Sequence, residues 1–248
     1  MATLYMVATP IGNLEDITLR ALRILGEVDT VACEDTRHTL KLLNHLGIKK
    51  PLIACYAYEE EKGSARILGL LNQGRNVAYC SDAGTPGISD PGVLAAQLAR
   101  EQGHEVVPIP GPSALAALAS AAGVFFKAVT FDGFPSPKPG RRRSRVRELM
   151  EREEAFIMYE SPHRIVKLLA DIAAVDAGRR ICVGRELTKL HEEFSVGAAA
   201  DIAADYEARK EIKGELAVLV AGGPKKARKA RAESRPGYRD EEESDEPL

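Results

Sequence analysis

The sequence has 248 residues, of which 45% are hydrophobic, and its 34 Lys and Arg nearly balance its 36 Asp and Glu, leaving a formal net charge of −2. This length suffices for one or two domains with a real core, and the charge balance excludes a surface that is basic all over. The four cysteines form no CxxC motif and the five histidines no HxxxH spacing. We therefore expect neither a disulfide-stabilised secreted domain nor a metal site.

The N-terminus carries no signal of secretion. It lacks a basic n-region followed by a long apolar stretch, and no apolar run approaches the about 18–20 residues needed to cross a bilayer. We expect a soluble, cytoplasmic protein that does not bind membranes.

In the first half of the chain, short apolar runs alternate with amphipathic stretches. The runs predict strands at 4–8, 30–33, 52–55, 76–80 and 105–109, and the stretches between them predict helices at 18–25, 36–46, 59–71, 91–102 and 113–122. Such strand–helix alternation indicates an α/β fold with a mostly parallel sheet covered on both faces.

The pattern restarts after residue 123. Strands are predicted at 129–131, 155–159, 181–184 and 215–221, and helices at 141–151, 163–173 and 198–208. We therefore predict an N-terminal α/β domain over 1–122 and a C-terminal α/β domain over 123–223, with a ligand cleft between them. From 224 to 248 a basic block is followed by an acidic block, which predicts a disordered tail.

Three loops that follow predicted strands have the composition of ligand-binding loops. The first holds Pro10, Ile11 and Gly12, at a turn into a helix. The second, residues 81–92, combines glycines, prolines and aspartates, which lets its backbone approach a ligand closely. We expect Asp90 at its end to cap the next helix, with Pro91 at the first helical position. The third loop, 108–114, should lie beside the second at one edge of the sheet.

Charged side chains mark further candidates. Glu34, Asp35 and Arg37 follow a predicted strand and predict an acid/base or substrate-anchoring group, or simply a helix cap with a surface ion pair. In the second half, Glu160 or His163 is a candidate acid/base, and Arg164 and Lys189 are candidate phosphate ligands. The arginines of the run 141–147 predict a polyanion-binding surface; they are Arg141, Arg142, Arg143, Arg145 and Arg147, preceded by Lys138.

Seven segments together resemble the ribosomal RNA small-subunit methyltransferase I family, a branch of the tetrapyrrole-methylase (class III) fold. They are VATPIGNLEDITLRAL, ACEDTR, SDAGTPGISDPG, PIPGPSA, YESPHRI, RELTK and KGELAVLV, in order from about residue 3 to 222. The resemblance implies two α/β domains with mostly parallel or mixed sheets and S-adenosylmethionine in the cleft between them. It further implies a homodimer that methylates the 2′-hydroxyl of a cytidine in the decoding region of 16S ribosomal RNA. Because RNA bases are read best when unpaired, we expect the substrate to be a splayed loop nucleotide or the assembled 30S subunit.

The resemblance also implies roles for particular residues. The cofactor would be bordered by the first-strand loop, wrapped by the second loop and closed from the second domain. These residues are Pro10, Ile11, Gly12, Ser81, Asp82, Ala83, Gly84, Thr85, Ser113, Ala114, Tyr159 and Leu187. The resemblance does not itself fix the base; among the charged residues, Glu34 or Asp35 is the candidate, with Arg37, His163 or Lys189 orienting the substrate. The basic residues singled out from the sequence would hold the RNA backbone; they are Lys138, Arg141, Arg142, Arg143, Arg145, His163, Arg164 and Lys189.

Two other functions fit the same sequence. One is a small-molecule methylase of the tetrapyrrole type, which would carry a GxGPGD-like first loop where this chain has Thr-Pro-Ile-Gly-Asn. The other is a non-catalytic RNA-binding or ribosome-assembly protein, in which the glycine-rich loops would be eroded. The intact loops and the arginine run favour the RNA methyltransferase.

Overall fold

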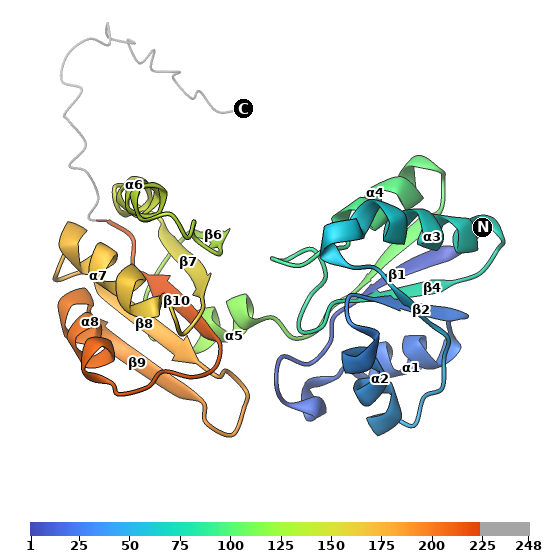
Figure 1. The fold of residues 1–248 in the computed structure, drawn as a ribbon, viewed down its shortest axis with the longest axis horizontal. Coiled ribbons are helices and arrows are strands. Elements are labelled where there is room, and N and C mark those ends of the chain that lie inside the picture. Colours follow the sequence, from blue (N-terminus) through green and yellow to red (C-terminus); the bar gives the residue numbers. More distant parts are fainter. Residues whose placement is uncertain (224–248) are drawn as a thin grey trace, which may run out of the picture.

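The chain is built on two separate five-stranded sheets, as the computed structural model shows for residues 1–223 (Figure 1). We call the part that contains the first sheet the first lobe and the part that contains the second sheet the second lobe. The charged tail predicted for 224–248 lies outside the described residues. Within residues 1–223, no helix has the length and apolar character required to cross a membrane.

The sheet of the first lobe is parallel throughout, in the order β3-β2-β4-β1-β5. Each strand coincides, to within one residue at either end, with one of the predicted apolar runs. The strands are β1 (Thr3–Val7), β2 (Thr30–Cys33), β3 (Leu52–Ala54), β4 (Val77–Cys80) and β5 (Glu105–Ile109). The fold is therefore of the predicted α/β class.

Helices cover both faces of this sheet, because successive strand residues point to opposite sides. Val31 packs with α1 and α2 on one face, whereas Ala32 packs with α3 and α4 on the other. The helices are α1 (Leu19–Glu27), α2 (Thr36–His45), α3 (Glu60–Asn72) and α4 (Val93–Glu101), with short 3-10 turns η1 (Leu14–Asp16) and η2 (Ala57–Glu59). Thr18 starts α1, since its hydroxyl accepts a hydrogen bond from the Ala21 N–H at 3.1 Å.

The second lobe has a mixed sheet, in the order β6-β7-β10-β8-β9. Only β6 and β7 are parallel neighbours; the other three pairs are antiparallel. The strands are β6 (Val129–Gly133), β7 (Ala155–Glu160), β8 (Arg180–Arg185), β9 (Glu193–Ala198) and β10 (Leu216–Val220). The sequence did not predict β9, which lies at the edge of the sheet.

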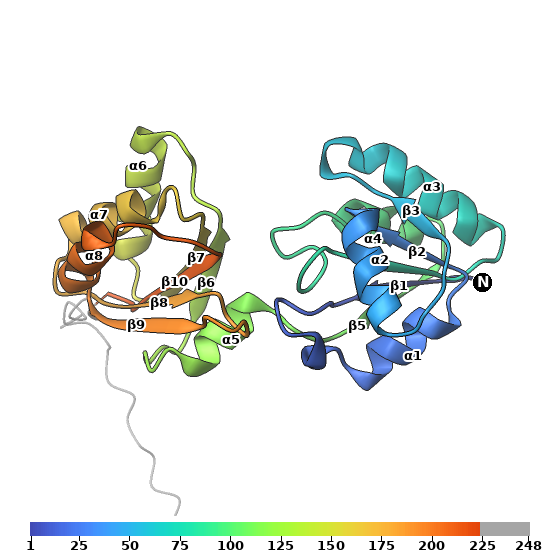
Figure 2. The same ribbon diagram turned by 60° about the horizontal axis from the view of Figure 1, so that its bottom comes forward.

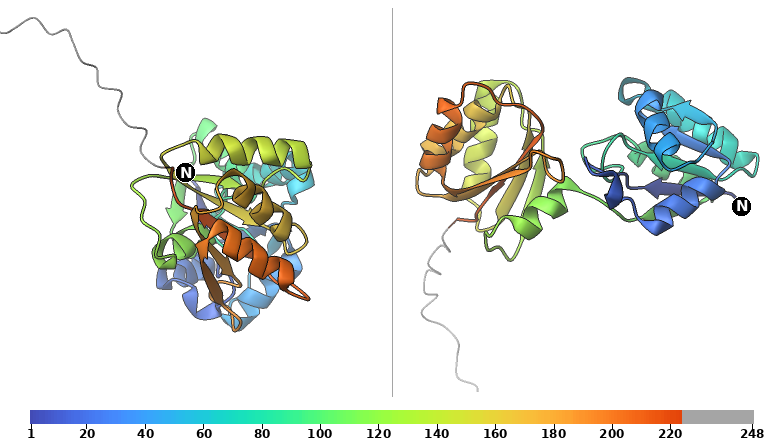
Figure 3. Two further views of the ribbon diagram at one scale, coloured as in Figure 1. Left: turned by 90° about the vertical axis from the view of Figure 1, so that its left-hand side faces the viewer. Right: turned by 90° about the horizontal axis from the view of Figure 1, so that it is seen from below.

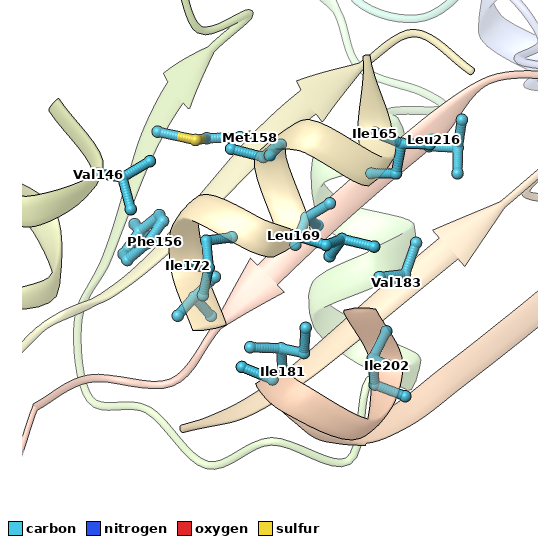
Figure 4. Close-up of a cluster of buried hydrophobic side chains, with 14 of the residues drawn as sticks. Val146, Phe156, Met158, Ile165, Leu169, Ile172, Ile181, Val183, Ile202 and Leu216 are labelled. Carbon is cyan, nitrogen blue, oxygen red and sulfur yellow. The ribbon is translucent and has the colours of Figure 1, made fainter. Parts of the chain in front are cut away.

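Three helices pack on one face of the second sheet: α6 (Pro139–Met150), α7 (Ile165–Val175) and α8 (Ala199–Ala208). Their apolar side chains form a continuous core with those of β7, β8 and β10 (Figure 4). Leu169 and Ile172 of α7, for example, lie over Val183 and Ile181 of β8. At about 1.5–3 kcal/mol per fully buried aliphatic side chain, this core supplies much of the lobe's stability.

The remaining face of the second sheet is covered by α5 (Ala114–Ala121). Leu118 of this helix is fully buried in a cluster with Ile157, Cys182 and Leu219 of the second sheet. Figures 2 and 3 show α5 against the second lobe, at the point where the chain arrives from the first lobe. The boundary at 122/123 assigned this helix to the first domain, but by its packing α5 is part of the second lobe.

Candidate functional site

Three loops meet at the carboxyl edge of the first sheet, because parallel strands all end at the same edge. Thr9 and Gly84 exchange two backbone hydrogen bonds, of 2.9 and 3.0 Å, which join the loop after β1 to the loop after β4. The Thr85 hydroxyl donates to the carbonyl of Pro112 at 3.1 Å and so joins the loop after β5. The predicted proximity of the second and third loops is confirmed.

This edge faces the second lobe across a cavity of about 400 Å³, a size within the about 300–1,000 Å³ of small-molecule sites. Both lobes line it. The first lobe and α5 contribute Ile11, Glu34, Asp82, Ala83, Gly84, Thr85, Ile88, Ser89, Asp90, Ser113 and Ala114; the second contributes Phe134, Tyr159, Glu160, Ser161, Pro162, Gly184, Leu187, Gly214, Glu215, Leu216 and Ala217. The cleft expected between two α/β halves is therefore present.

The structure places most of the expected cofactor residues on this cavity. Those that line it are Ile11, Asp82, Ala83, Gly84, Thr85, Ser113, Ala114, Tyr159 and Leu187. Pro10, Gly12 and Ser81 are not among the lining residues. Ser81 is buried behind the loop and donates its hydroxyl hydrogen to the Gly84 carbonyl at 3.1 Å. Gly12 lies against the side chain of Lys189, so close that a Cβ at this position would overlap the Lys189 Cγ.

The cavity holds several carboxylates, and two of them have raised pKa values. Burial, and then the charges of Glu34, Asp82 and Glu215, raise the pKa of Asp90 to about 6. Burial, followed by the charges of Asp82 and Asp35, also raises the pKa of Glu34. Both effects disfavour the ionised carboxylate. A positively charged ligand group in the cavity would stabilise these carboxylates in their ionised form.

Asp90 does not cap the following helix, contrary to the sequence-based expectation. Helix α4 begins at Val93 with Gly92 in the capping position, at φ +124°, and the Gly92 N–H donates to Glu60 Oε1 at 2.8 Å. Because the glycine turns the chain before the helix starts, Asp90 is left facing the cavity. Because an Asp followed by Pro is typical of a helix start, the sequence pattern did not indicate that Asp90 faces the cavity.

Two neighbouring residues of the second lobe are firmly held where they line the cavity. The ring of Tyr159 meets Phe131 and Phe134 edge-on, with ring centroids 4.9 and 5.7 Å apart. The Glu160 side chain is fully buried; its Oε1 is 2.7 Å from Arg164 and accepts from the Ser161 N–H at 2.8 Å. Within residues 1–223 its Oε2 has no hydrogen-bond partner. A buried carboxylate oxygen of this kind is suited to accept a hydrogen bond from a ligand.

The three catalytic candidates are divided between two places. Glu34 lines the cavity between the two lobes, called the main cavity from here on. Asp35 caps α2 by accepting from the Arg37 N–H at 2.8 Å, and its carboxylate forms two further bonds to the Arg37 guanidinium, of 3.1 and 2.8 Å. These bonds to Arg37 lower the pKa of Asp35 to about 2. Asp35 is thus a weak base, and of the three candidates only Glu34 lies where the two lobes meet.

The arginine run forms α6, and it is not a uniform basic surface. Arg142 is 4% exposed, and its Nε is 2.7 Å from Asp171 of α7. Its predicted contact with RNA is therefore wrong, because a buried, paired guanidinium cannot reach a phosphate. Arg145 is paired with Asp132 and Glu148. Exposed positions of the set are Lys138, Arg141, Arg143 and Arg147.

The other expected RNA ligands also differ in availability. His163 is exposed, next to the cavity residue Pro162. Arg164 is committed to Glu160, as described. Lys189 is held by Glu186 at 2.8 Å and Glu215 at 3.1 Å. Arg164 and Lys189 therefore organise the cavity walls and are not free cations.

Comparison with known proteins defines the class first. The Tetrapyrrole (Corrin/Porphyrin) Methylases family matches residues 3–203 of this chain. A cobalamin biosynthetic enzyme, cobalt precorrin-4 methyltransferase, superposes with a TM-score of 0.66 over 88% of this chain and 94% of its own, at 16% sequence identity. At that identity the likeness concerns the fold alone, which is that of the tetrapyrrole methylases.

Sequence relatives define the branch. This chain is 44% identical over 219 residues to the ribosomal RNA small subunit methyltransferase I of Borrelia garinii subsp. bavariensis, covering 88% of this chain and 98% of the relative. It is 45% identical over 225 residues to the protein of the same name from Pseudomonas aeruginosa, covering 89% and 79%. The chain belongs to the ribosomal RNA small subunit methyltransferase I family, as its motifs indicated.

Proposed function

We propose that the protein transfers a methyl group from S-adenosylmethionine to the ribosomal RNA of the small subunit, at the 2′-hydroxyl of a cytidine in the decoding region. The observation that carries this proposal is the identity of 41–45% to relatives named for ribosomal RNA methylation, over 88–90% of the chain. The tetrapyrrole-type alternative rests on neighbours that share only the fold.

The residues of the cavity fit S-adenosylmethionine. Ile11, Ala83, Ala114 and Leu187 offer apolar surface suited to an adenine ring. Asp82 and the unpartnered Oε2 of Glu160 offer acceptors for its positively charged end. When bound, the cofactor supplies an activated methyl group on a cationic sulfur. Pro10, Gly12 and Ser81 have an indirect role in this proposal, since they shape the loops that contact it.

A ribose hydroxyl is a poor nucleophile near neutral pH, so a base must assist the removal of its proton; such assistance is typically worth about 10²–10⁴-fold in rate. Glu34 and Asp90 both face the cavity, and burial raises the pKa of each. A base works best when its pKa lies near the working pH, which favours these two over Asp35. We assign the proton transfer to the Glu34–Asp90 pair.

The RNA backbone is assigned to the exposed cations. Arg141 and Arg143 on α6, Lys138 just before it and His163 beside the cavity are accessible to phosphates. Arg145, Arg164 and Lys189 are paired with carboxylates, and we assign them a supporting role. We further propose that the enzyme acts as a cytoplasmic homodimer on 16S ribosomal RNA assembled in the 30S subunit, where an unpaired nucleotide can be presented.

The test is a calorimetric titration with S-adenosylmethionine and a methyl-transfer assay on undermethylated 30S subunits, followed by mapping of ribose methylation. In the parent protein the Asp35 N–H donates to Asp82 Oδ1 at 3.0 Å. Asp82→Asn keeps this acceptor oxygen but removes the negative charge from the cavity. We expect it to weaken cofactor binding at least tenfold while RNA binding persists. Asp201→Asn, on the exposed face of α8, is the matched control and should bind normally.

The result that would contradict the proposal is equally concrete. If the protein binds RNA but neither the cofactor alone nor the cofactor in the presence of 30S subunits, it is a non-catalytic RNA-binding protein. If it methylates a tetrapyrrole and leaves 30S subunits untouched, the small-molecule alternative is correct.

A further inference from the structure

A second cavity adjoins the first at the carboxyl edge of the first sheet. It measures about 420 Å³ and is lined by Glu34, Asp35, Thr36, Arg37, Tyr56 and Asp82. Glu34 and Asp82 also line the main cavity. A molecule bound in this second cavity would therefore reach the same carboxylates as one bound in the main cavity. The proposed function assigns no part of the cofactor or of the RNA to this second cavity.

The second cavity is bordered by a stacked pair of tyrosines. The rings of Tyr56 and Tyr58 have centroids 5.2 Å apart and planes inclined by only 11°. Tyr56 lines the cavity, and Tyr58 stacks on it from η2. They remain 40% and 80% exposed, respectively. Large aromatic rings are normally placed where they bury most of their surface, so an exposed parallel pair at a cavity indicates a surface that receives another flat group.

The charged groups around the tyrosines indicate which flat group fits. The Asp35–Arg37 pair forms one wall, and the Arg37 side chain is 87% exposed. Glu34 and Asp82 are acceptors, which match the exocyclic amino group of a base such as cytosine or adenine. Three carboxylates within the lining disfavour a phosphate. The chemistry of this space is that of a base, with the backbone passing outside.

We propose that the second cavity is a nucleobase subsite, in which an unpaired base of the RNA substrate stacks on Tyr56, backed by Tyr58, beside the methyl-transfer cavity. This inference rests on the proposed RNA methyltransferase function and names a part of the substrate-binding surface. Single-stranded RNA is commonly held in this way, by aromatic rings on which bases stack and by hydrogen bonds to their edges. Arg37 then contacts the base through its exposed guanidinium face.

The experiment compares loss of the ring with retention of the ring. Tyr56→Leu and Tyr58→Leu remove the stack, whereas Tyr56→Phe and Tyr58→Phe keep it. The probe is a fluorescein-labelled ribo-hexacytidylate, with affinity measured by anisotropy between 50 and 200 mM salt. Stacking of one base is worth about 1–3 kcal/mol, so we expect Tyr56→Leu to weaken binding about tenfold and the Phe variants to stay within about twofold of the parent.

Two further readouts separate stacking from other causes. The salt dependence of the remaining affinity should be unchanged in Tyr56→Leu, because no phosphate contact is lost. S-adenosylmethionine binding should be unaltered, which also shows that the variant is folded. In methyl transfer to 30S subunits, Tyr56→Leu should raise the KM for the subunit more than it lowers kcat. A 5-iodocytidine-substituted probe should cross-link to the peptide that contains Tyr56 and Tyr58.

The outcomes that overturn the inference differ from those that overturn the function. If 30S subunits are methylated and both Leu variants bind RNA and turn over like the parent, the subsite is wrong and the function stands. If the Leu variants change the mass of the assembly in solution and not RNA affinity, the tyrosine pair is a protein–protein contact. If the parent binds no cofactor and methylates no subunits, the proposed function itself fails.

Discussion

Replacing Asp90 with Asn should stabilise the protein, and the gain should depend on pH. The pKa of Asp90 is raised from its usual 3.8 to about 6, so the unfolded chain loses this proton at a lower pH than the folded protein. Below about pH 4 the carboxyl is neutral in both states and contributes nothing. As the pH rises through about 4–6, the folded state is increasingly penalised, and the penalty is complete above about pH 6.

The size of this penalty follows from the same two values. Their difference corresponds to about 3 kcal/mol for a carboxylate fully shielded from water. Asp90 is only partly buried, and solvent screening reduces the expected gain to about 1–2 kcal/mol. Asn removes the charge at nearly constant volume, so the gain should appear in full at pH 7.5 and vanish at pH 4.

Urea unfolding followed by far-ultraviolet circular dichroism is the suitable assay, since the chain has no tryptophan. Parent, Asp90→Asn and the exposed control Asp201→Asn should be compared at pH 4.0, 5.0, 6.0 and 7.5. A gain for Asp90→Asn that is equal at all four pH values would refute the reasoning, because it would show that ionisation is not its source. Methyl transfer should fall in the same variant, as expected when a charged site group is exchanged for stability.

Three other variants probe different parts of the molecule. Arg142→Ala leaves the largely shielded Asp171 carboxylate, 14% exposed, without its partner and should cost about 3 kcal/mol in urea unfolding, whereas the exposed Arg143→Ala should cost almost nothing; equal losses would contradict the buried pair. Replacing Lys138, Arg141 and Arg143 together by Ala should reduce the slope of log affinity for RNA against log salt by about two; an unchanged slope would remove α6 from the RNA surface. Gly84→Ala forces a Cβ at φ +82° to within 3.3 Å of Ile11, so it should lower stability by about 1–2 kcal/mol and weaken cofactor binding in a calorimetric titration.

The first sheet was predictable because each of its strands is a short apolar run between polar residues. Strands β2 and β5 occupy the predicted residues, β3 and β4 are one residue shorter at one end, and β1 is shifted by one residue toward the N-terminus. β9 was missed since its Ser195 and exposed Val196 give the weak alternation of an edge strand. The local sequence also did not indicate the lobe on which α5 packs, because a helix rich in Ala and Leu can pack equally well on either sheet.

The site was predictable in the parts that depend on parallel topology. Strands that run in one direction bring their carboxyl ends together, so the loops after β1, β4 and β5 could be grouped from chain order alone. Residues 214–217 could not be placed in this way. In the second sheet, β10 is antiparallel to β7 and β8, so its amino end lies at the edge where β7 and β8 have their carboxyl ends. Arg142 was misjudged by composition; its spacing of i, i+4 and i+7 with Val146 and Leu149, both buried, marks it as part of the inner face of α6.

The packing of α5 has a consequence for how the protein can be taken apart. Ser113 and Ala114 line the cavity on a helix whose Leu118 is anchored in the second sheet, while the residue before them, Pro112, is bonded to Thr85 of the first. The binding site therefore depends on covalent and packing connections between the two lobes. A fragment that ends at residue 122 would expose the apolar face of α5 to solvent, because the second sheet on which α5 packs would be missing. A fragment that ends at residue 112 would lack α5 altogether. Neither lobe alone therefore carries a whole binding site.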